Sequence, residues 1–277
     1  MAGHTLCFVL SVKFGKSAVN SVFGSGFRLS LALAFGLRLI APASLAATGD
    51  PAVGVRKAFQ DTQMRYQKEP RNNEAARQFA RACFDLADLA TNNAQRIEIA
   101  ERGIAACKQL LSRDSNSAPG HYYLGMNLGQ VAQTRGLGAL KLVTEMEREF
   151  SAARDLDSSF DYAGPDRNLG LLYRDAPAMV SIGSRTRAKK HLQRAVELAP
   201  NYPENHLNLI EAYVKWNERN AAHNELKTVE ELLPRSRANF GGKAWEASWA
   251  DWEERLRKIR KKLEEPTKAI PSPRQKE

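Results

Sequence analysis

Two segments of this chain, AKKHLQRAVELAP at residues 188–200 and AHNELKTVEELLP at residues 222–234, carry small and large apolar residues at the same positions. In both segments an alanine, a leucine and a second apolar residue stand 12, 8 and 5 residues before the closing proline. Small residues let two helices approach closely, and large ones fill the groove between neighbouring helices. Proline lacks a backbone N–H, so Pro200 and Pro234 are predicted to end the second helix of a pair.

The same spacing recurs twice upstream when serine is accepted at the closing position. Asp114-Ser115 and Asp157-Ser158 follow apolar residues at the expected offsets, which gives four units that close at 115, 158, 200 and 234. The last interval, 34 residues, is the length of a tetratricopeptide repeat, and the earlier units are longer. We therefore predict an all-α fold, an α-solenoid of tetratricopeptide-like helix pairs with a C-terminal capping helix, over residues 48–264. An irregular helical bundle is the alternative.

The capping helix is predicted at residues 243–264, where six large apolar residues recur every three or four positions. This spacing lines one face of a helix. A solenoid needs a cap because its last repeat otherwise exposes an apolar face to water. The same seam could instead join two subunits, so a homo-oligomer is an open alternative. The six residues are Trp245, Trp249, Trp252, Leu256, Ile259 and Leu263.

The two ends of the chain differ from this repeat domain. Residues 1–47 are typical of a signal peptide, since they combine four basic residues, no acidic residue and an apolar run at 29–37 with small residues at 41–47. The run is too short to span a bilayer as a helix. We therefore predict export, to the periplasm in a bacterium; an uncleaved anchor is the alternative, and membrane association stays open. The basic residues 265–277 are predicted to be a disordered tail.

The formal net charge of +10 is concentrated at the same two ends. Residues 1–47 contribute +4 and residues 255–277 contribute +6, so the part between them has equal numbers of basic and acidic residues. A nucleic-acid-binding domain needs a basic face on its folded body. The charge distribution therefore argues against nucleic acid as a partner.

The sequence gives no support to enzymatic chemistry. The five histidines show no metal-binding spacing, and there is no glycine-rich phosphate loop or nucleophile elbow. Cys83 and Cys107 are the cysteines that follow the leader; an oxidising compartment permits a disulfide between them, and two buried thiols are the alternative. We therefore predict a non-enzymatic protein without catalytic residues, metal or cofactor.

Candidate partner-binding residues recur in the first helices of successive pairs. An amide offers both a donor and an acceptor, which suits it to an extended peptide on the concave face of a solenoid. Three asparagines stand nearly one elongated repeat apart, at Asn127, Asn168 and Asn208. The alternative is that they hydrogen-bond within the repeats. Three tyrosines are predicted to share the binding face, with a role in the core as the alternative: Tyr123, Tyr173 and Tyr213.

The order of motifs between residues 118 and 216 carries a resemblance to a known family. The motifs are HYYLGMNLGQVAQTRG at 121–136, GALKLV at 138–143, DYAGP at 161–165, NLGLLY at 168–173 and YPENH at 202–206. Their order resembles the T-component family of periplasmic helical-repeat proteins associated with tripartite ATP-independent periplasmic (TRAP) transporters. The resemblance implies association with a transporter's substrate-binding subunit, homo-oligomers, and passage of a hydrophobic or organic-acid ligand through an internal channel.

Members of that family are typically lipid-anchored, whereas no cysteine follows the apolar run of this leader. We predict an exported helical-repeat binding or scaffold protein that engages a protein or peptide partner, such as a periplasmic solute-binding protein. The alternative is a carrier or conduit for a small apolar or organic-acid ligand within the superhelix. An open polar groove is expected for the first function, and an enclosed apolar cavity for the second.

Overall fold

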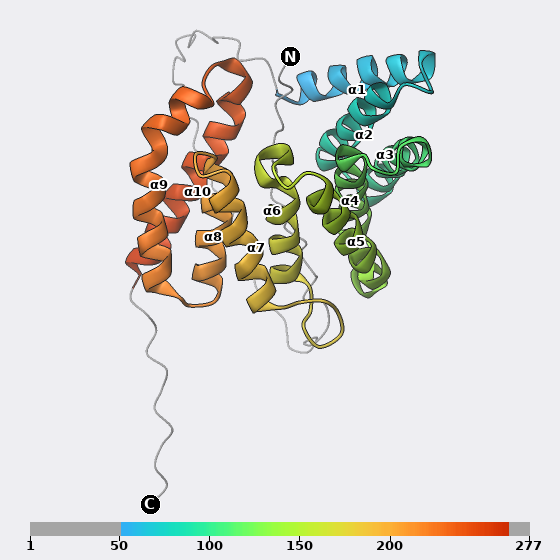
Figure 1. Ribbon diagram of the computed structural model, residues 1–277. Helices are drawn as coiled ribbons and strands as arrows, with labels where there is room; N and C mark the ends of the chain where they lie inside the picture. The colour runs from blue at the N-terminus through green and yellow to red at the C-terminus, as the bar shows by residue number, and fades with distance from the viewer. Residues whose placement is uncertain (1–50, 266–277) are drawn as a thin grey trace, which may run out of the picture.

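The computed structural model describes residues 51–265, which form ten α-helices and two short 3-10 helices without a β-strand in that range (Figure 1). The predicted signal peptide at 1–47 and all but the first residue of the predicted tail at 265–277 lie outside the described residues. The repeat domain itself is the all-α solenoid that the sequence predicts.

The helices follow one another as a single leading helix, four antiparallel pairs and a final helix. The first is α1 (Pro51–Lys68), and the last is α10 (Glu246–Glu264), which the 3-10 helix η2 (Lys243–Trp245) precedes. The pairs are α2 (Asn73–Asp88) with α3 (Asn93–Arg113), α4 (Ala118–Ala132) with α5 (Leu140–Leu156), α6 (Phe160–Asp175) with α7 (Arg185–Leu198), and α8 (Pro203–Lys215) with α9 (Arg219–Asn239). The 3-10 helix η1 (Gly136–Ala139) leads into α5.

The apolar residues at the repeated spacing face the interior, as predicted. α3 and α5 end at Arg113 and Leu156, directly before the two Asp-Ser closures, and α7 ends two residues before Pro200. All six spaced residues of the last two pairs are buried: Ala188, Leu192, Ala195, Ala222, Leu226 and Val229.

Pro234 does not end its helix, and that prediction was wrong. α9 continues past it to Asn239. The hydroxyl of Ser236 donates to the backbone oxygen of Asn201 at 2.8 Å, and Phe240 packs on Trp245 with 4.9 Å between ring centroids. A proline inside a helix costs about 3 kcal/mol. These contacts beyond Pro234 attach the last turn to neighbouring elements and offset that cost.

Glycines at the helix crossings allow close packing within the pairs. A Cβ atom added at Gly125 would lie 2.7 Å from the ring of Phe150, and one at Gly170 would lie 2.6 Å from Cγ of Leu192. Neither neighbour is the free end of a flexible side chain. α4 therefore approaches α5, and α6 approaches α7, at distances that a larger residue does not allow.

A histidine–carboxylate pair connects the two helices in three of the four pairs. In each, a ring Nδ1 lies 2.5 to 2.7 Å from a carboxylate oxygen on the other helix. In α4 and α8 the histidine stands on the first helix, and in α6 and α7 the order is reversed. The pairs are His121–Glu149, Asp166–His191 and His206–Glu225.

The buried apolar residues form two clusters that meet at α6. The first extends from Phe59 in α1 to Ala188 in α7, and the second from Leu171 in α6 to Leu263 in α10. Trp216 at the end of α8 packs against both clusters. Figure 1 shows α6 between the group α1–α5 and the group α7–α10. The two halves of the solenoid therefore join at α6.

The C-terminal helix caps the solenoid, as predicted, although its first tryptophan, Trp245, lies in the 3-10 helix η2 and not in α10. The six residues of its seam are buried within this chain, because α10 packs on α8. Trp249 Nε1 donates to the backbone oxygen of Phe240 at 2.6 Å, and Trp252 Nε1 donates to Glu204 Oε2 at 2.8 Å. The seam is thus satisfied without a second subunit.

Cys83 and Cys107 are free, buried thiols in the first cluster. Burial raises the pKa of Cys83 to about 12 and that of Cys107 further. The structure therefore agrees with the alternative of two core thiols rather than with the disulfide.

Gly170→Ala tests the close packing of α6 against α7. The added methyl group overlaps Leu192 and lies 3.1 Å from its backbone nitrogen. We expect the free energy of unfolding to fall by about 1 to 3 kcal/mol, the usual cost of overpacking, in a urea titration followed by circular dichroism.

The matched control is Gly54→Ala in α1, where an added Cβ meets nothing within 4 Å. That substitution should stabilise the protein by about 0.5 to 1 kcal/mol, because alanine favours a helix over glycine. Equal effects of the two substitutions would contradict the close approach of α6 and α7.

Candidate functional site

The three predicted asparagines are buried and hydrogen-bond inside the chain. Their exposed fractions are 0% for Asn127, 4% for Asn168 and 0% for Asn208. In each, Nδ2 donates four residues back along its own helix, to Tyr123 O, Gly164 O and Glu204 Oε1. The recurrence therefore fits the alternative, in which the amides act within the repeats. Partner binding by these residues stays a prediction.

The three predicted tyrosines are also buried, and the hydroxyls of two of them hydrogen-bond to side chains of α5 and α7. Tyr173 donates to Glu147 Oε1 at 2.7 Å, and Tyr213 accepts from Gln193 Nε2 at 3.1 Å. Burial and the bond to Glu147 raise the pKa of Tyr173 to about 12. Tyr123 is 2% exposed and packs edge-on against Tyr122. The structure thus brings the six residues to the interior rather than to one open groove.

A left-handed turn opens α6 and is the most unusual backbone feature of the described chain. Asp161, Tyr162 and Ala163 have φ values of 51°, 55° and 61°. Each non-glycine residue in this region costs about 1 to 2 kcal/mol. The right-handed part of α6 begins beside Pro165, whose fixed φ suits the first turn of a helix. Strain of this kind persists only where surrounding contacts hold it.

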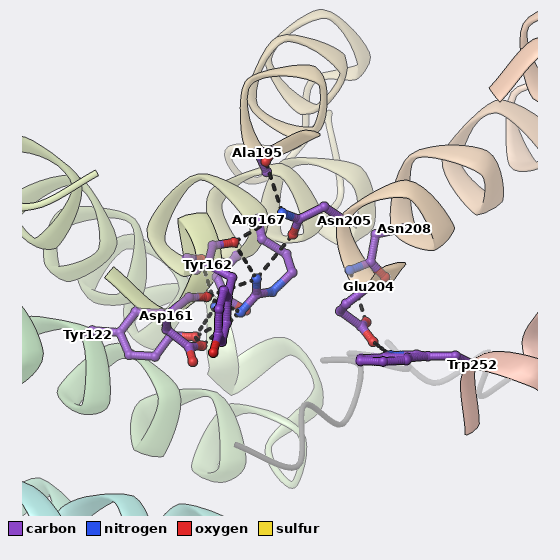
Figure 2. A network of polar contacts seen from close by, with 11 residues as sticks. Tyr122, Asp161, Tyr162, Arg167, Ala195, Glu204, Asn205, Asn208 and Trp252 are labelled. Carbon is purple, nitrogen blue, oxygen red and sulfur yellow. Dashed lines mark hydrogen bonds and ion pairs between the residues drawn. The ribbon is translucent and has the colours of Figure 1, made fainter. Parts of the chain in front are cut away.

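A buried ion pair holds the turn from inside. Arg167 Nη2 lies 2.8 Å from Asp161 Oδ2, and the two side chains are 1% and 5% exposed. Arg167 Nη1 also donates to the backbone oxygens of Asp161 and Tyr162, at 3.2 and 3.1 Å. Figure 2 shows the guanidinium group facing the carboxylate and the turn. The arginine therefore satisfies both the charge and the carbonyl groups that the turn exposes.

Neighbouring first helices supply the remaining contacts of this turn. From α4, the hydroxyl of Tyr122 donates to Asp161 Oδ2 at 2.7 Å. From α8, Asn205 Oδ1 accepts from Arg167 Nη1 at 3.1 Å, and Asn205 Nδ2 donates to Tyr162 O at 3.0 Å (Figure 2). We call these five residues the inner polar cluster. It connects α4, α6 and α8.

Four aromatic residues lie beside the inner polar cluster, and we call them the aromatic ledge: Tyr162, Tyr202, Phe240 and Trp245. Tyr162 stacks on Tyr202 with 4.5 Å between ring centroids, and Phe240 and Trp245 stand edge-on to Tyr162 at 5.3 and 6.1 Å. Tyr162 is 38% exposed, whereas the three rings behind it are buried. The strained turn therefore presents one accessible aromatic side chain on a rigid, buried aromatic support.

A second buried polar group links α8 to the cap. Arg255 Nη1 lies 2.7 Å from Glu204 Oε1, and Nη2 donates to Asn208 Oδ1 at 2.8 Å. Burial opposes the charge of Arg255, but Glu204 and Glu211 raise its pKa above the ordinary value. The cap is thus attached by a charged contact in addition to its tryptophans.

Asp85 of α2 adds a titratable group to the polar interior. Its Oδ1 atom is buried and has no hydrogen-bond partner within the described residues. Burial raises the pKa of this carboxyl from 3.8 to about 7, and Arg81, with Nε 3.7 Å from Oδ2, opposes the shift. Burial therefore favours the neutral form of this carboxyl.

The described residues contain no group of three or more histidine, cysteine or acidic side chains arranged to hold a metal ion. Among the same residues, no helix has the length and apolar character needed to cross a membrane. The two charged side chains of the inner polar cluster, Asp161 and Arg167, are paired with each other, and Tyr162 is its exposed member.

Sequence reasoning missed all five residues of the cluster as site candidates. It selected asparagines at the repeat spacing. Asn205 stands three residues before Asn208 and therefore falls outside that spacing. The available signal was Pro165, which follows Asp161-Tyr162 inside an otherwise helical stretch and indicates that the helix starts anew there.

Comparison with solved structures supports the repeat fold. The chain is similar to the crystal structure of a thermophilic TPR (tetratricopeptide-repeat) protein from Thermus thermophilus, with a TM-score of 0.56 and 18% sequence identity. The alignment covers 76% of this chain and 92% of that one. At this identity the likeness shows the fold alone, a TPR-like helical repeat.

Comparison with families gives a partial match. The family model described as RMD1-3, Regulator of microtubule dynamics protein 1-3, matches residues 51–157, which is less than half of the chain. No curated protein matches the sequence. Neither the family nor the solved structure shows the TRAP-associated family that the motif order resembles, so that resemblance stays a prediction.

Ala163→Gly tests the strain of the left-handed turn, with Ala212→Gly in the regular helix α8 as its matched control. Both alanines are completely buried, so both substitutions remove one buried methyl group. Glycine costs about 1 kcal/mol in a right-handed helix but relieves about 1 to 2 kcal/mol in the left-handed region.

We therefore expect Ala163→Gly to be more stable than Ala212→Gly by about 2 kcal/mol in chemical denaturation. Equal losses of stability would contradict the strained backbone at Ala163.

Proposed function

We propose that this protein is a helical-repeat scaffold that binds an extended segment of a partner protein at the junction of α4, α6 and α8. The observation that carries the proposal is the strained turn at Asp161–Ala163. This turn exposes the ring of Tyr162, while the three aromatic rings packed against it are buried. Strained backbone concentrates at functional sites. TPR-like repeats generally serve as protein-interaction scaffolds, which agrees with this function.

The aromatic ledge has the properties of a binding anchor. Aromatic side chains supported by a rigid scaffold contribute a large contact area at a small entropic cost, and they are enriched among residues that dominate interfaces. Tyr162 lies over Tyr202 and beside the Asp161–Arg167 pair. A partner segment on this ledge would contact the exposed ring of Tyr162, while the buried Asp161–Arg167 pair holds the turn beneath it.

The class of partner is inferred from two parts of the sequence. The motif order at 118–216 favours an exported protein that engages a transporter's solute-binding component, and the leader at 1–47 agrees with export. The family match at 51–157 favours a second candidate, a partner associated with microtubules, because the family is described as a regulator of microtubule dynamics. The two candidates differ in compartment, so the identity of the captured partner separates them.

The pockets of the described residues give less support to the alternative function, a carrier of a small apolar ligand. The groove along α7 is lined mainly by charged side chains, and a smaller pocket of about 170 Å³ between α8 and α10 includes Arg255, Lys258 and Lys262. Neither is the enclosed apolar cavity that a carrier of an apolar ligand would need.

Site-specific photo-crosslinking tests the proposed function. A benzophenone amino acid replaces Tyr162 in the full chain, and the matched control carries it in place of Met64 on α1, which is 52% exposed. We expect a protein partner to be crosslinked from position 162 and not from position 64. The partner is then purified, and its affinity is measured by calorimetry.

Tyr162→Ala should weaken that affinity about tenfold, since a central aromatic contact contributes about 1 kcal/mol or more. Met64→Ala should leave the affinity unchanged. A partner that crosslinks equally from both positions, or an affinity that Tyr162→Ala does not alter, would contradict the proposed site.

A further inference from the structure

The surface of α7 is strongly basic although the repeat domain as a whole is neutral. Its first ten residues, RTRAKKHLQR at 185–194, hold five lysines or arginines and no acidic residue. Arg185 and Arg194 are each 54% exposed, and Lys190 is exposed as well. The buried side of the same helix is formed by alanine and leucine. The basic residues therefore belong to the solvent face.

A groove of about 970 Å³ runs along this face. Its lining includes four cations of α7, one of α5 and a carboxylate at the start of α9: Arg185, Lys189, Lys190, Arg194, Arg154 and Glu218. We call it the α7 groove. A volume of this size lies at the upper end of the range of ligand sites in proteins. It is large enough for several residues of a bound chain.

Ion pairs within the α7 groove position some of its cations and leave others available. Glu218 accepts from Arg185 at 2.5 Å and from Lys189 at 2.9 Å, which holds both side chains toward the start of α9. Arg194 pairs with Glu197 on its own helix, at 3.0 Å with both side chains more than half exposed. Lys190 has no acidic partner among the described residues. Ion pairs at the surface contribute little stability, so Arg185 and Arg194 can leave their glutamates for an acidic ligand at little cost.

The spacing of the cations fits an extended chain. Arg185 and Lys189, and likewise Lys190 and Arg194, stand four residues apart on α7. Four residues of α-helix rise by about 6 Å, and every second residue of an extended peptide is separated by about 6.6 Å. Acidic side chains at alternate positions of an extended peptide would therefore meet successive cations of the helix.

We infer that the α7 groove binds an acidic, extended peptide segment of a protein partner. This inference does not depend on the aromatic ledge, because it uses other residues. The positive charge of the groove predicts a negatively charged partner. The spacing of the cations along α7 predicts that the bound segment is extended. Asp166, Glu197 and Glu218 interrupt the positive charge of the groove, which fits acidic residues at alternate positions of a peptide better than the continuous phosphates of a nucleic acid. The concave shape disfavours a flat anionic membrane.

Fluorescence anisotropy tests this inference on the full chain. The probe is a fluorescein-labelled 12-residue peptide of alternating glutamate and threonine. A peptide of alternating lysine and threonine is its control. We expect saturable binding of the acidic peptide alone, which weakens between about 50 and 300 mM salt because exposed charges are screened.

Lys190→Glu with Arg194→Glu should weaken the binding at least about tenfold, since two favourable pairs become repulsive. Lys190→Gln with Arg194→Gln removes the charges without repulsion and should cause a smaller loss, which covers the case in which the first variant misfolds. The matched control is Lys57→Glu with Lys227→Glu, which makes the same change in net charge at side chains that are 73% and 81% exposed. It should alter the affinity less than about twofold.

Three results would overturn the inference: no saturable binding of the acidic peptide, equal binding of the lysine peptide, or equal losses in the α7 variant and the control. Oligothymidine of 12 nucleotides and vesicles of phosphatidylserine with phosphatidylcholine serve as competing probes. If either binds more tightly than the peptide and loses binding in the α7 variant, the occupant is a nucleic acid or a membrane instead.

Discussion

The buried ion pair between Asp161 and Arg167 is the contact on which the junction of the two halves depends. It lies in the first half of α6, the helix that contributes residues to both apolar clusters. The arginine binds the carboxylate and two carbonyl groups of a left-handed turn, and this turn would otherwise expose strained backbone. A buried charge without a partner is strongly destabilising. The pair and the turn therefore require each other.

The inner polar cluster extends this constraint to the neighbouring repeats. Tyr122 ties α4 to the carboxylate, and Asn205 ties α8 to the arginine and the turn. One residue before Asn205, Glu204 binds Arg255 and Trp252 of the cap. Polar contacts thus run from α4 to α10 along the first helices. Apolar packing alone tolerates sliding of one helix on another, whereas these directional contacts fix one register.

The repeat architecture could be predicted from the sequence because each pair obeys local rules. Small residues at Ala188 and Ala222 and the Asp-Ser closures mark helix crossings and helix ends regardless of what lies elsewhere in the chain. Pro234 failed as a helix end because Ser236 and Phe240, which follow it, have long-range partners. The spacing of Asn168 and Asn208 follows the repeat, but it did not reveal which way the amides face.

The candidate site was less predictable because it depends on contacts between repeats. Nothing in the local sequence says that Arg167 meets Tyr122 and Asn205, since these residues are 45 and 38 positions away. The left-handed conformation of Asp161–Ala163 is likewise set by that arginine and not by a glycine. We therefore expect the functional site where contacts between repeats hold the backbone in a conformation that its own residues disfavour, as they do at Asp161–Ala163.

A double-mutant cycle on Asp161→Asn and Arg167→Met measures this central contact most directly, with the free energy of unfolding as the readout. Each single substitution leaves one buried group without its charged partner and should cost about 3 to 5 kcal/mol. If the pair holds the junction, the double variant loses far less than the sum of the single losses. Single losses below about 1 kcal/mol, or losses that simply add, would show that the two residues do not act as a unit.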